Sequence, residues 1–209
     1  MSYNPIIIIA GEPNSIFLEI FFKTFKKKKF KSPILIICSY KLFLMQMKKL
    51  NYNYKVNLIN EINIKSNLKK NKINLLNVNY KPKKAFEKIS SKSNKYIENC
   101  FDVAIKLLKS KVSDKLINGP ISKKYFLKNK YLGITEYLAK KTKTKKFAML
   151  IYNKKLSVVP ITTHLPIKYV AKKINKREII DKIQIINNFY KQKLKKSPTF
   201  GVTGLNPHC

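Results

Sequence analysis

The chain has 209 residues, 44% of them hydrophobic, which is enough for one large or two small domains with an apolar core. Its 45 Lys and Arg residues against 10 Asp and Glu give a formal net charge of +35, which invites a nucleic-acid-binding interpretation. Every basic residue except Arg177 is Lys, however, whereas recognition of phosphates and base edges favours the planar guanidinium of Arg. The lysines are also spread along most of the chain. We therefore interpret the charge mainly as the codon bias of an AT-rich genome, with nucleic-acid binding as the less favoured alternative.

Neither of the two most apolar segments is predicted to cross a membrane. Residues 5–22 lack a basic leader and are interrupted by Gly11 and Glu12. Residues 32–45 are interrupted by Lys41, well short of the roughly 20 apolar residues that a spanning helix needs. The three cysteines form no C-x-x-C pair, which argues against a disulfide framework and for a reducing compartment. These features predict a cytoplasmic protein.

Strands and helices are predicted to alternate in the first part of the chain. Apolar runs near Ile6–Ala10 and Ile34–Cys38 predict parallel strands covered on both faces. The segment between them predicts a helix. Its core-facing side is expected to carry Ile16, Ile20, Phe21 and Phe25. Residues 51–84 are polar and rich in Asn and Lys, and they are expected to form edge strands and loops.

A long amphipathic helix is predicted over residues 84–111. Its apolar side is marked by Tyr96, Cys100, Ala104 and Leu107, which recur at helical spacing. A strand is then expected near Lys115–Asn118, followed by a Gly-Pro turn and a helix that begins at Lys123. Another helix is expected to begin at Thr135 and Glu136.

Three further strands are predicted near Phe147–Ile151, Leu156–Thr162 and Phe200–Thr203. A long helix, "NKREIIDKIQIINNFYKQKLKK", lies between the second and the third. Alternation of this kind predicts an α/β fold with a largely parallel or mixed sheet. Such sheets bind ligands at the carboxyl ends of their strands, so the functional residues are expected there.

The chain contains only two histidines, His164 in "TTHLPI" and His208 in "GLNPHC". Imidazole is a common metal ligand, so one interpretation makes the pair part of a metal site. The alternative makes His164 a polar residue at a strand end and His208 part of an unstructured terminus. The two residues alone leave this choice open.

Five segments in chain order, "AGEP", "NGPISK", "GITEYLA", "TTHLPI" and "VTGLNPH", resemble the 4-hydroxythreonine-4-phosphate dehydrogenase family. The resemblance extends over the whole chain. It implies an α/β fold of the isocitrate/isopropylmalate dehydrogenase type, with two lobes around a cleft and the second lobe incomplete here. The first lobe would comprise residues 1–125, and the partial second lobe, carrying the histidines, residues 126–209. A fold of this type also implies the lack of the glycine-rich G-x-G-x-x-G loop.

The resemblance also implies an activity. Family members oxidise 4-phosphooxy-L-threonine with NAD, and the product then loses carbon dioxide. By this resemblance His164 and His208 would be two of three ligands of a divalent cation, Zn²⁺, Mg²⁺ or Co²⁺, which acidifies the substrate hydroxyl. Thr135 would contact the substrate, and the positive background would attract its phosphate. The family further implies a homodimer.

The chain departs from the family pattern at several positions. Ile134 occupies the place of a family histidine that contacts substrate, and Asn14 and Ser15 replace an Ala-Gly pair. The sequence stops at Cys209, where the family continues with a segment that carries the third metal histidine, the phosphate-binding Lys and Arg, and much of the NAD site. An inactive, truncated or decaying remnant of the enzyme is therefore the main alternative. We also expect an unpaired strand edge and an uncovered apolar face.

Overall fold

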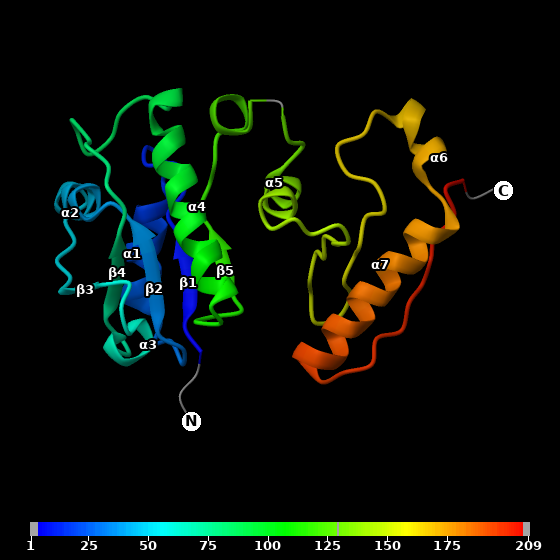
Figure 1. The fold of residues 1–209 in the computed structure, drawn as a ribbon, viewed down its shortest axis with the longest axis horizontal. Coiled ribbons are helices and arrows are strands. Elements are labelled where there is room, and N and C mark those ends of the chain that lie inside the picture. Colours follow the sequence, from blue (N-terminus) through cyan, green and yellow to red (C-terminus); the bar gives the residue numbers. More distant parts are fainter. Residues whose placement is uncertain (1–3, 129, 207–209) are drawn as a thin grey trace. The chain divides into compact units, whose positions relative to one another are not determined.

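The computed structural model describes residues 4–128 and 130–206. The chain separates into two compact units, Met1–Lys128 and Asn129–Cys209 (Figure 1). The division falls directly after the helical turn Lys123–Leu127, within which the predicted lobe boundary at residue 125 lies.

The first unit is built on a five-stranded parallel sheet with the strand order β3-β4-β2-β1-β5. The strands are β1 (Ile6–Ile9), β2 (Ile34–Cys38), β3 (Val56–Ile59), β4 (Ile73–Asn77) and β5 (Leu116–Asn118). Ile8 in the centre pairs with Ile36 on one side and Ile117 on the other. This confirms the parallel α/β class and the three strands predicted in this unit. Because all five strands run the same way, their carboxyl ends share one edge of the sheet.

Four helices connect these strands: α1 (Phe17–Lys27), α2 (Tyr40–Lys49), α3 (Ile64–Asn67) and α4 (Asn94–Lys109). One core cluster joins buried side chains of α1 and α2 to alternate strand residues such as Ile36 and Leu75. Helix α4 contacts β1 and β2 and lies in front of the sheet in Figure 1. Strand residues outside that cluster, such as Leu35 and Ile37, are also fully buried, so both faces of the sheet are covered.

The predicted core-facing side of α1 is confirmed in part, because Phe21 is buried and Phe25 packs against the core cluster, whereas the two isoleucines do not. Ile16 and Ile20 are 64% and 49% exposed. The buried residues of the helix are Leu18, Phe21 and Phe22. Leu18 lies three and four residues before the two Phe residues, so these three form the helical stripe that meets the sheet. Phe21 also contacts the rings of Phe25 and Phe43, at centroid distances of 5.9 and 6.3 Å.

Helix α4 has the predicted apolar side but is shorter than expected. Its residues Tyr96, Cys100, Ala104 and Leu107 are all buried. The helix starts at Asn94, after a single 3₁₀ turn at Ser91–Ser93. Serine side chains compete for backbone hydrogen bonds and favour helix starts over helix interiors. Ser90 does this here, because its hydroxyl accepts a hydrogen bond from the amide of Lys92.

The Asn-rich region 51–84 contains one edge strand, β3, and one interior strand, β4, rather than edge strands alone. Polar Asn74 is nevertheless fully buried in β4. Its amide nitrogen donates to the Ile34 carbonyl at 2.9 Å, and its amide oxygen accepts from the Asn57 side chain at 2.8 Å. Satisfied hydrogen bonds let this residue enter the core.

The second unit contains the helices α5 (Ile134–Lys141), α6 (Val170–Lys173) and α7 (Lys176–Phe189), the last extended by a π turn at Tyr190–Leu194. The three strands predicted here are wrong as strands. Among residues 130–206 the only strand pairing is an antiparallel bridge between Ile151 and Val158. An isolated pair of extended segments has marginal stability unless further strands join it. This accounts for the missing sheet.

Apolar side chains of this unit are exposed where strands were expected. They include Met149, Ile151, Leu156, Val158, Val202 and Leu205. The described residues thus show the uncovered apolar surface that the sequence predicts. None of the helices in residues 4–128 and 130–206 combines the length and hydropathy of a membrane span.

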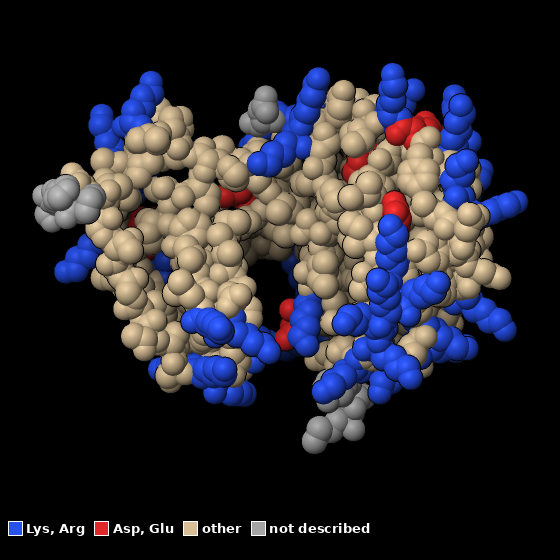
Figure 2. Space-filling view, turned by 180° about the vertical axis from the view of Figure 1, so that it is seen from behind, with Lys and Arg blue, Asp and Glu red and all other residues tan. Residues whose placement is uncertain are grey.

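The positive charge is distributed over both units. In Figure 2, Lys and Arg side chains project from many places on the face shown, and acidic side chains appear only as small separate spots. Some of the lysines form ion pairs, among them Lys106 with Glu61 and Lys146 with Asp181. On this face the positive charge is spread over the surface and is not confined to a single patch.

Candidate active site

Two loops meet at the carboxyl edge of the sheet in the first unit, one after β1 and one after β5. The Glu12 amide donates to the Pro120 carbonyl at 2.8 Å, and the Gly119 amide donates to the Ile9 carbonyl at 2.7 Å. Gly11 has a φ of +77°, and a Cβ built on it would lie 2.3 Å from the Pro120 carbonyl oxygen. A Cβ on Gly119 would lie 2.2 Å from the Ala10 carbonyl oxygen. Glycine at both positions is therefore what lets the "AGEP" and "NGPISK" backbones touch.

Glu12 carries a carboxylate that is buried beside these loops, with only 3% of the residue exposed. Its Oε2 accepts a hydrogen bond from the Ser93 hydroxyl at 2.9 Å. Its Oε1 accepts from the backbone amide of Asn14 at 3.3 Å. Ser93 directly precedes α4, so the carboxylate joins the loop after β1 to the start of that helix. Hydrogen bonds of this kind are what make a buried charge tolerable.

The same loop is fastened on its other side by Gln46 of α2. The Gln46 side-chain amide donates to the carbonyls of Pro13 and Ala85, each at 2.7 Å. Asn14 adds a third link, because its side-chain oxygen accepts from the Glu87 amide at 2.9 Å. The loop after β1 is therefore held by side-chain hydrogen bonds to α2 and to the segment before α4.

The "NGPISK" segment forms the predicted turn and helix start. The Ser122 hydroxyl accepts from the Tyr125 amide at 3.1 Å and so caps the helical turn that begins at Lys123. Lys123 itself is exposed. Its ammonium group is therefore available to an anionic ligand at the carboxyl edge of the sheet.

In the second unit, His164 lies beside the first turn of α5. A Cβ built on Gly133, which precedes the helix, would lie 3.7 Å from Nε2 of His164 and 3.1 Å from Oε2 of Glu136. The imidazole and the carboxylate thus share the space above Gly133. The hydroxyl of Thr163 donates to Oε1 of Glu136 at 3.3 Å. Thr135 belongs to the same helical turn, so the "GITE" and "TTHLP" segments come together here.

The backbone of His164 is unusual, because its φ is +55°. Few residues other than Gly adopt this left-handed conformation, although His, Asn and Asp do so more often than most. The residue as a whole is exposed to solvent. His164 does not end a regular strand, contrary to the expectation, since the segment before it is unpaired except at Val158.

The expected partner of His164, His208, lies outside the described residues. Among residues 4–128 and 130–206, no three His, Cys, Asp or Glu side chains lie close enough together to bind one metal ion. Catalytic metal sites generally use three protein ligands and one open position. Of the metal ligands that the resemblance implies, the described residues therefore include one, His164.

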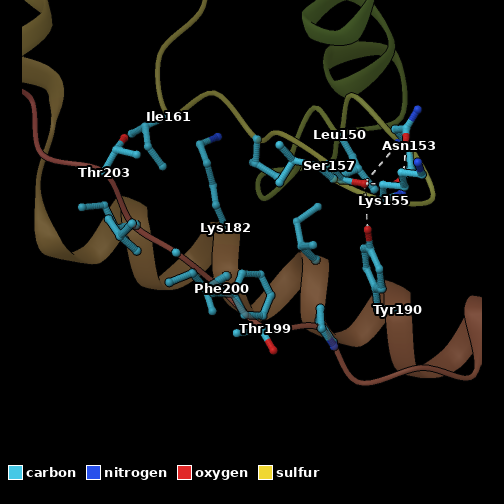
Figure 3. Close-up of a pocket in the computed structure, with 18 of the residues that line it drawn as sticks. Leu150, Asn153, Lys155, Ser157, Ile161, Lys182, Tyr190, Thr199, Phe200 and Thr203 are labelled. Atoms are coloured by element: carbon cyan, nitrogen blue, oxygen red, sulfur yellow. Dashed lines mark hydrogen bonds between the residues drawn. The ribbon is translucent and has the colours of Figure 1, made fainter.

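A cavity of about 690 Å³ lies elsewhere in the second unit, between α7 and the extended segments. Its walls are largely apolar, and Figure 3 shows Ile161 and Thr203 at one end and Tyr190 at the other. The Tyr190 hydroxyl donates to the Ser157 hydroxyl at 2.9 Å or accepts from it. The cavity occupies the place where a sheet would pack on α7, so we attribute it to the unpaired segments and not to a ligand.

The two cysteines in the described part of the chain, Cys38 and Cys100, are both buried and free. Burial raises the pKa of the Cys100 thiol to about 12. Burial, and secondarily the neighbouring Cys100, raise the pKa of Cys38 well above its usual range. The thiolate is the reactive form of cysteine, so neither residue is suited to act as a nucleophile.

Two residues that the structure places at these loops, Glu12 and Glu136, were not predicted from the sequence to be functional residues. A signal for Glu12 existed, because an acidic residue directly after a buried strand must be paired if it is buried too. Nothing in the sequence indicated that Glu136 would reach a residue as distant as Thr163.

Comparison with known proteins matches these motifs to one family. The family described as "Pyridoxal phosphate biosynthetic protein PdxA" matches residues 29–209. A 4-hydroxythreonine-4-phosphate dehydrogenase from a Sulfurihydrogenibium species is 36% identical over 206 residues, which are 97% of this chain and 63% of that protein. The enzyme of that name from Aquifex aeolicus is 42% identical over 96 residues, 45% of this chain and 30% of that one.

Solved structures agree in fold. The crystal structure of a 4-hydroxythreonine-4-phosphate dehydrogenase from Burkholderia phymatum superposes with a TM-score of 0.80 at 22% sequence identity. The superposition covers 100% of this chain and 64% of that chain. The chain thus spans less than two thirds of the length of these relatives.

Proposed function

The chain belongs to the family of the pyridoxal phosphate biosynthetic protein PdxA, and on this premise we propose that it serves the NAD-dependent oxidation and decarboxylation of 4-phosphooxy-L-threonine. The reaction removes a hydride from the hydroxyl-bearing carbon to NAD and releases the hydroxyl proton. The carbonyl so formed is β to the carboxylate, which then leaves as carbon dioxide. The product is 3-amino-2-oxopropyl phosphate.

One observation carries this proposal. The "GITE" and "TTHLP" segments, which the family resemblance links to substrate and metal, lie together in the second unit with His164 above Gly133. The residues between them include a helix and two extended segments, so this juxtaposition is a product of the fold.

The residues have distinct roles in the proposed reaction. His164 and His208 would supply imidazole nitrogens to a divalent cation, Zn²⁺, Mg²⁺ or Co²⁺, which when bound would acidify the substrate hydroxyl. Thr135 would hydrogen-bond the substrate. Ile134 at the neighbouring position can neither donate nor accept a hydrogen bond, so it weakens or alters recognition there. The lysine-rich surface would attract the substrate phosphate.

Other properties of the family enter as part of the same proposal. We propose two lobes of the isocitrate/isopropylmalate dehydrogenase type, assembled as a homodimer. We also propose a cytoplasmic location, which is supported by the free thiols of Cys38 and Cys100. The NAD-binding residues are not assigned.

The main alternative is an inactive remnant of this enzyme. It is supported by the exposed apolar segments of the second unit. Nucleic-acid binding stays a third, weaker possibility, because the charge is carried almost wholly by Lys.

The deciding experiment measures NAD reduction by the purified chain with 4-phosphooxy-L-threonine, in the presence of each cation and of a chelator. Cation-dependent NADH formation that is lost in His164→Asn supports the proposal. Asn tolerates the left-handed backbone at this position, so the variant removes the imidazole with little strain. A folded chain that forms no NADH with any of the three cations would support the remnant instead.

A further inference from the structure

We propose that Glu136 is a positioning residue for His164, which it holds by fastening the Thr163–His164 turn to the first turn of α5. The importance of this role for catalysis rests on the proposed function, in which His164 is a metal ligand. The positioning itself can be tested without metal or substrate.

The contacts of the Glu136 carboxylate point in two directions. Oε1 accepts the hydrogen bond from the Thr163 hydroxyl at 3.3 Å. Oε2 lies 3.1 Å from the position that a Cβ of Gly133 would occupy, and Nε2 and Cδ2 of His164 lie 3.7 and 4.0 Å from the same point. One oxygen therefore holds the residue before His164, and the other lies with the imidazole above Gly133.

Gly133 makes room for this arrangement. Its φ is −161°, an extended conformation that any residue adopts, so glycine is not needed for backbone freedom. A Cβ here would instead lie 3.1 Å from the Glu136 carboxylate, a tight contact, and at the ordinary contact distance of 3.7 Å from the imidazole. Glycine at position 133 thus leaves room for the Glu136 carboxylate beside His164.

The backbone of His164 needs such an anchor. A non-glycine residue in the left-handed region is strained, and the conformation persists only where its surroundings hold it. The hydrogen bond on the adjacent Thr163 supplies a restraint directly before the strained residue. Glu136 is itself well placed, because a carboxylate in the first turn of a helix is stabilised by the helix dipole.

Another residue of the second unit provides a matched control. Glu178 is the third residue of α7, as Glu136 is of α5, and both are the acidic residue of their helix's first turn. Asn175 accepts from the Glu178 amide at 2.9 Å, so that helix start is capped independently of the Glu178 carboxylate. Replacing either glutamate removes a negative charge from the start of a helix. Only the replacement of Glu136 should also change the position of His164.

The test is nuclear Overhauser contact between the His164 ring protons and the α-protons of Gly133 in the full chain. Only two histidines are present, so their ring signals can be assigned with a His208→Gln variant. We expect the contact in the wild type and in Glu178→Ala, and its loss in Glu136→Ala. Glu136→Gln keeps an oxygen for Thr163 and should retain most of it.

An unchanged contact in Glu136→Ala, or its equal loss in Glu178→Ala, overturns the positioning role. Titration of the same variants with Zn²⁺ separates this result from the proposed function. If His164 binds the cation, Glu136→Ala should bind about 10- to 100-fold more weakly, as is typical when a partner of a metal ligand is removed. A wild type that binds no Zn²⁺ but shows the contact and its loss would refute the metal site alone and leave the positioning role intact.

Discussion

At the scale of single residues, the buried carboxylate of Glu12 can be replaced by an amide of nearly the same shape, which tests its hydrogen bonds. Glu12→Gln puts an amide nitrogen where one carboxylate oxygen accepts from Ser93 or Asn14. A buried hydrogen-bond partner left unsatisfied costs about 1–3 kcal/mol, so we expect the free energy of unfolding to fall by that amount. Urea denaturation measures it. Glu19→Gln, which removes an exposed carboxylate paired with Lys23, should cost below about 1 kcal/mol. Equal losses in both variants would contradict the structural role of Glu12.

The buried thiols predict how stability depends on alkaline pH. Cys100 has an ordinary pKa of 9.0 in the unfolded chain and a pKa raised by burial to about 12 in the folded one. Below pH 9 the thiol is protonated in both states, and its contribution to stability is fully present. Above pH 9 only the unfolded thiol ionises, so stability should fall by about 1.4 kcal/mol per pH unit until the folded thiol ionises as well.

Cys100→Ala tests this by removing the ionisable group. Its stability should fall less steeply than that of the wild type above pH 9, and the two slopes should agree below pH 9. The comparison uses slopes because the substitution also leaves a small cavity, whose cost does not vary with pH. Parallel curves above pH 9 would show that the thiol ionises equally in both states. Burial also raises the pKa of Cys38 and of Tyr96, so both groups steepen both curves. Cys100 raises these two pKa values further as a smaller cause, so its removal should flatten the variant's curve slightly more than the loss of its own thiol alone.

At the scale of elements, helices and strands are predictable from the sequence where the local pattern of apolar residues determines which side chains are buried. The apolar runs of β1 and β2 and the apolar stripe of α4 are of this kind. A continuous apolar run favours a strand buried on both faces, and a long apolar stripe leaves only one face of a helix to be buried. In α1 two apolar stripes compete, and only packing against the sheet decides that Leu18 and Phe22 are inside and Ile16 is outside. The interior position of β4 depends on the hydrogen bonds of Asn74, which composition does not reveal.

The candidate site was predictable only in part for the same reason. Motif resemblance selects His164 and Thr135, but the left-handed backbone of His164 and the reach of Glu136 to Thr163 arise from tertiary contacts. The predicted strands of the second unit fail differently. Their apolar alternation is present in the sequence, but a strand also needs a partner, and only Ile151 and Val158 find one.

Unpaired backbone predicts fast hydrogen exchange in those segments. Amides of β1 and β2 lie within the sheet and should exchange slowly, at rates set by unfolding of the unit. Amides of residues 147–162 and 199–203 should exchange quickly because few hydrogen bonds protect them. The exceptions are Ile151 and Val158, which pair with each other, and Asn153 and Lys155, whose amides donate to side chains. Mass spectrometry of deuterated peptides distinguishes the two groups. Protection of residues 199–203 equal to that of β2 would mean that these segments are paired in solution.

At the scale of the whole molecule, a net charge of +35 and an exposed apolar surface act against each other. Like charge keeps copies of the chain apart, whereas exposed side chains such as Leu156 and Val202 favour their association. Salt shortens the reach of the repulsion, from a Debye length of about 10 Å at 0.1 M to about 3 Å at 1 M, and leaves the apolar attraction in place. Association should therefore increase with NaCl concentration.

Light scattering across a salt series measures this association. Leu156→Ser with Val202→Ser should reduce the increase, because both side chains are exposed and their replacement removes apolar surface at little cost to the fold. Ile62→Ser is the control, since it removes one equally exposed side chain that lies in the first unit, outside these apolar segments, and it should change the salt response less. Association that instead decreases with salt would show that contacts between opposite charges dominate. With only 10 acidic residues per chain, a bound polyanion would then be the natural source of the negative charge, and nucleic-acid binding would regain weight.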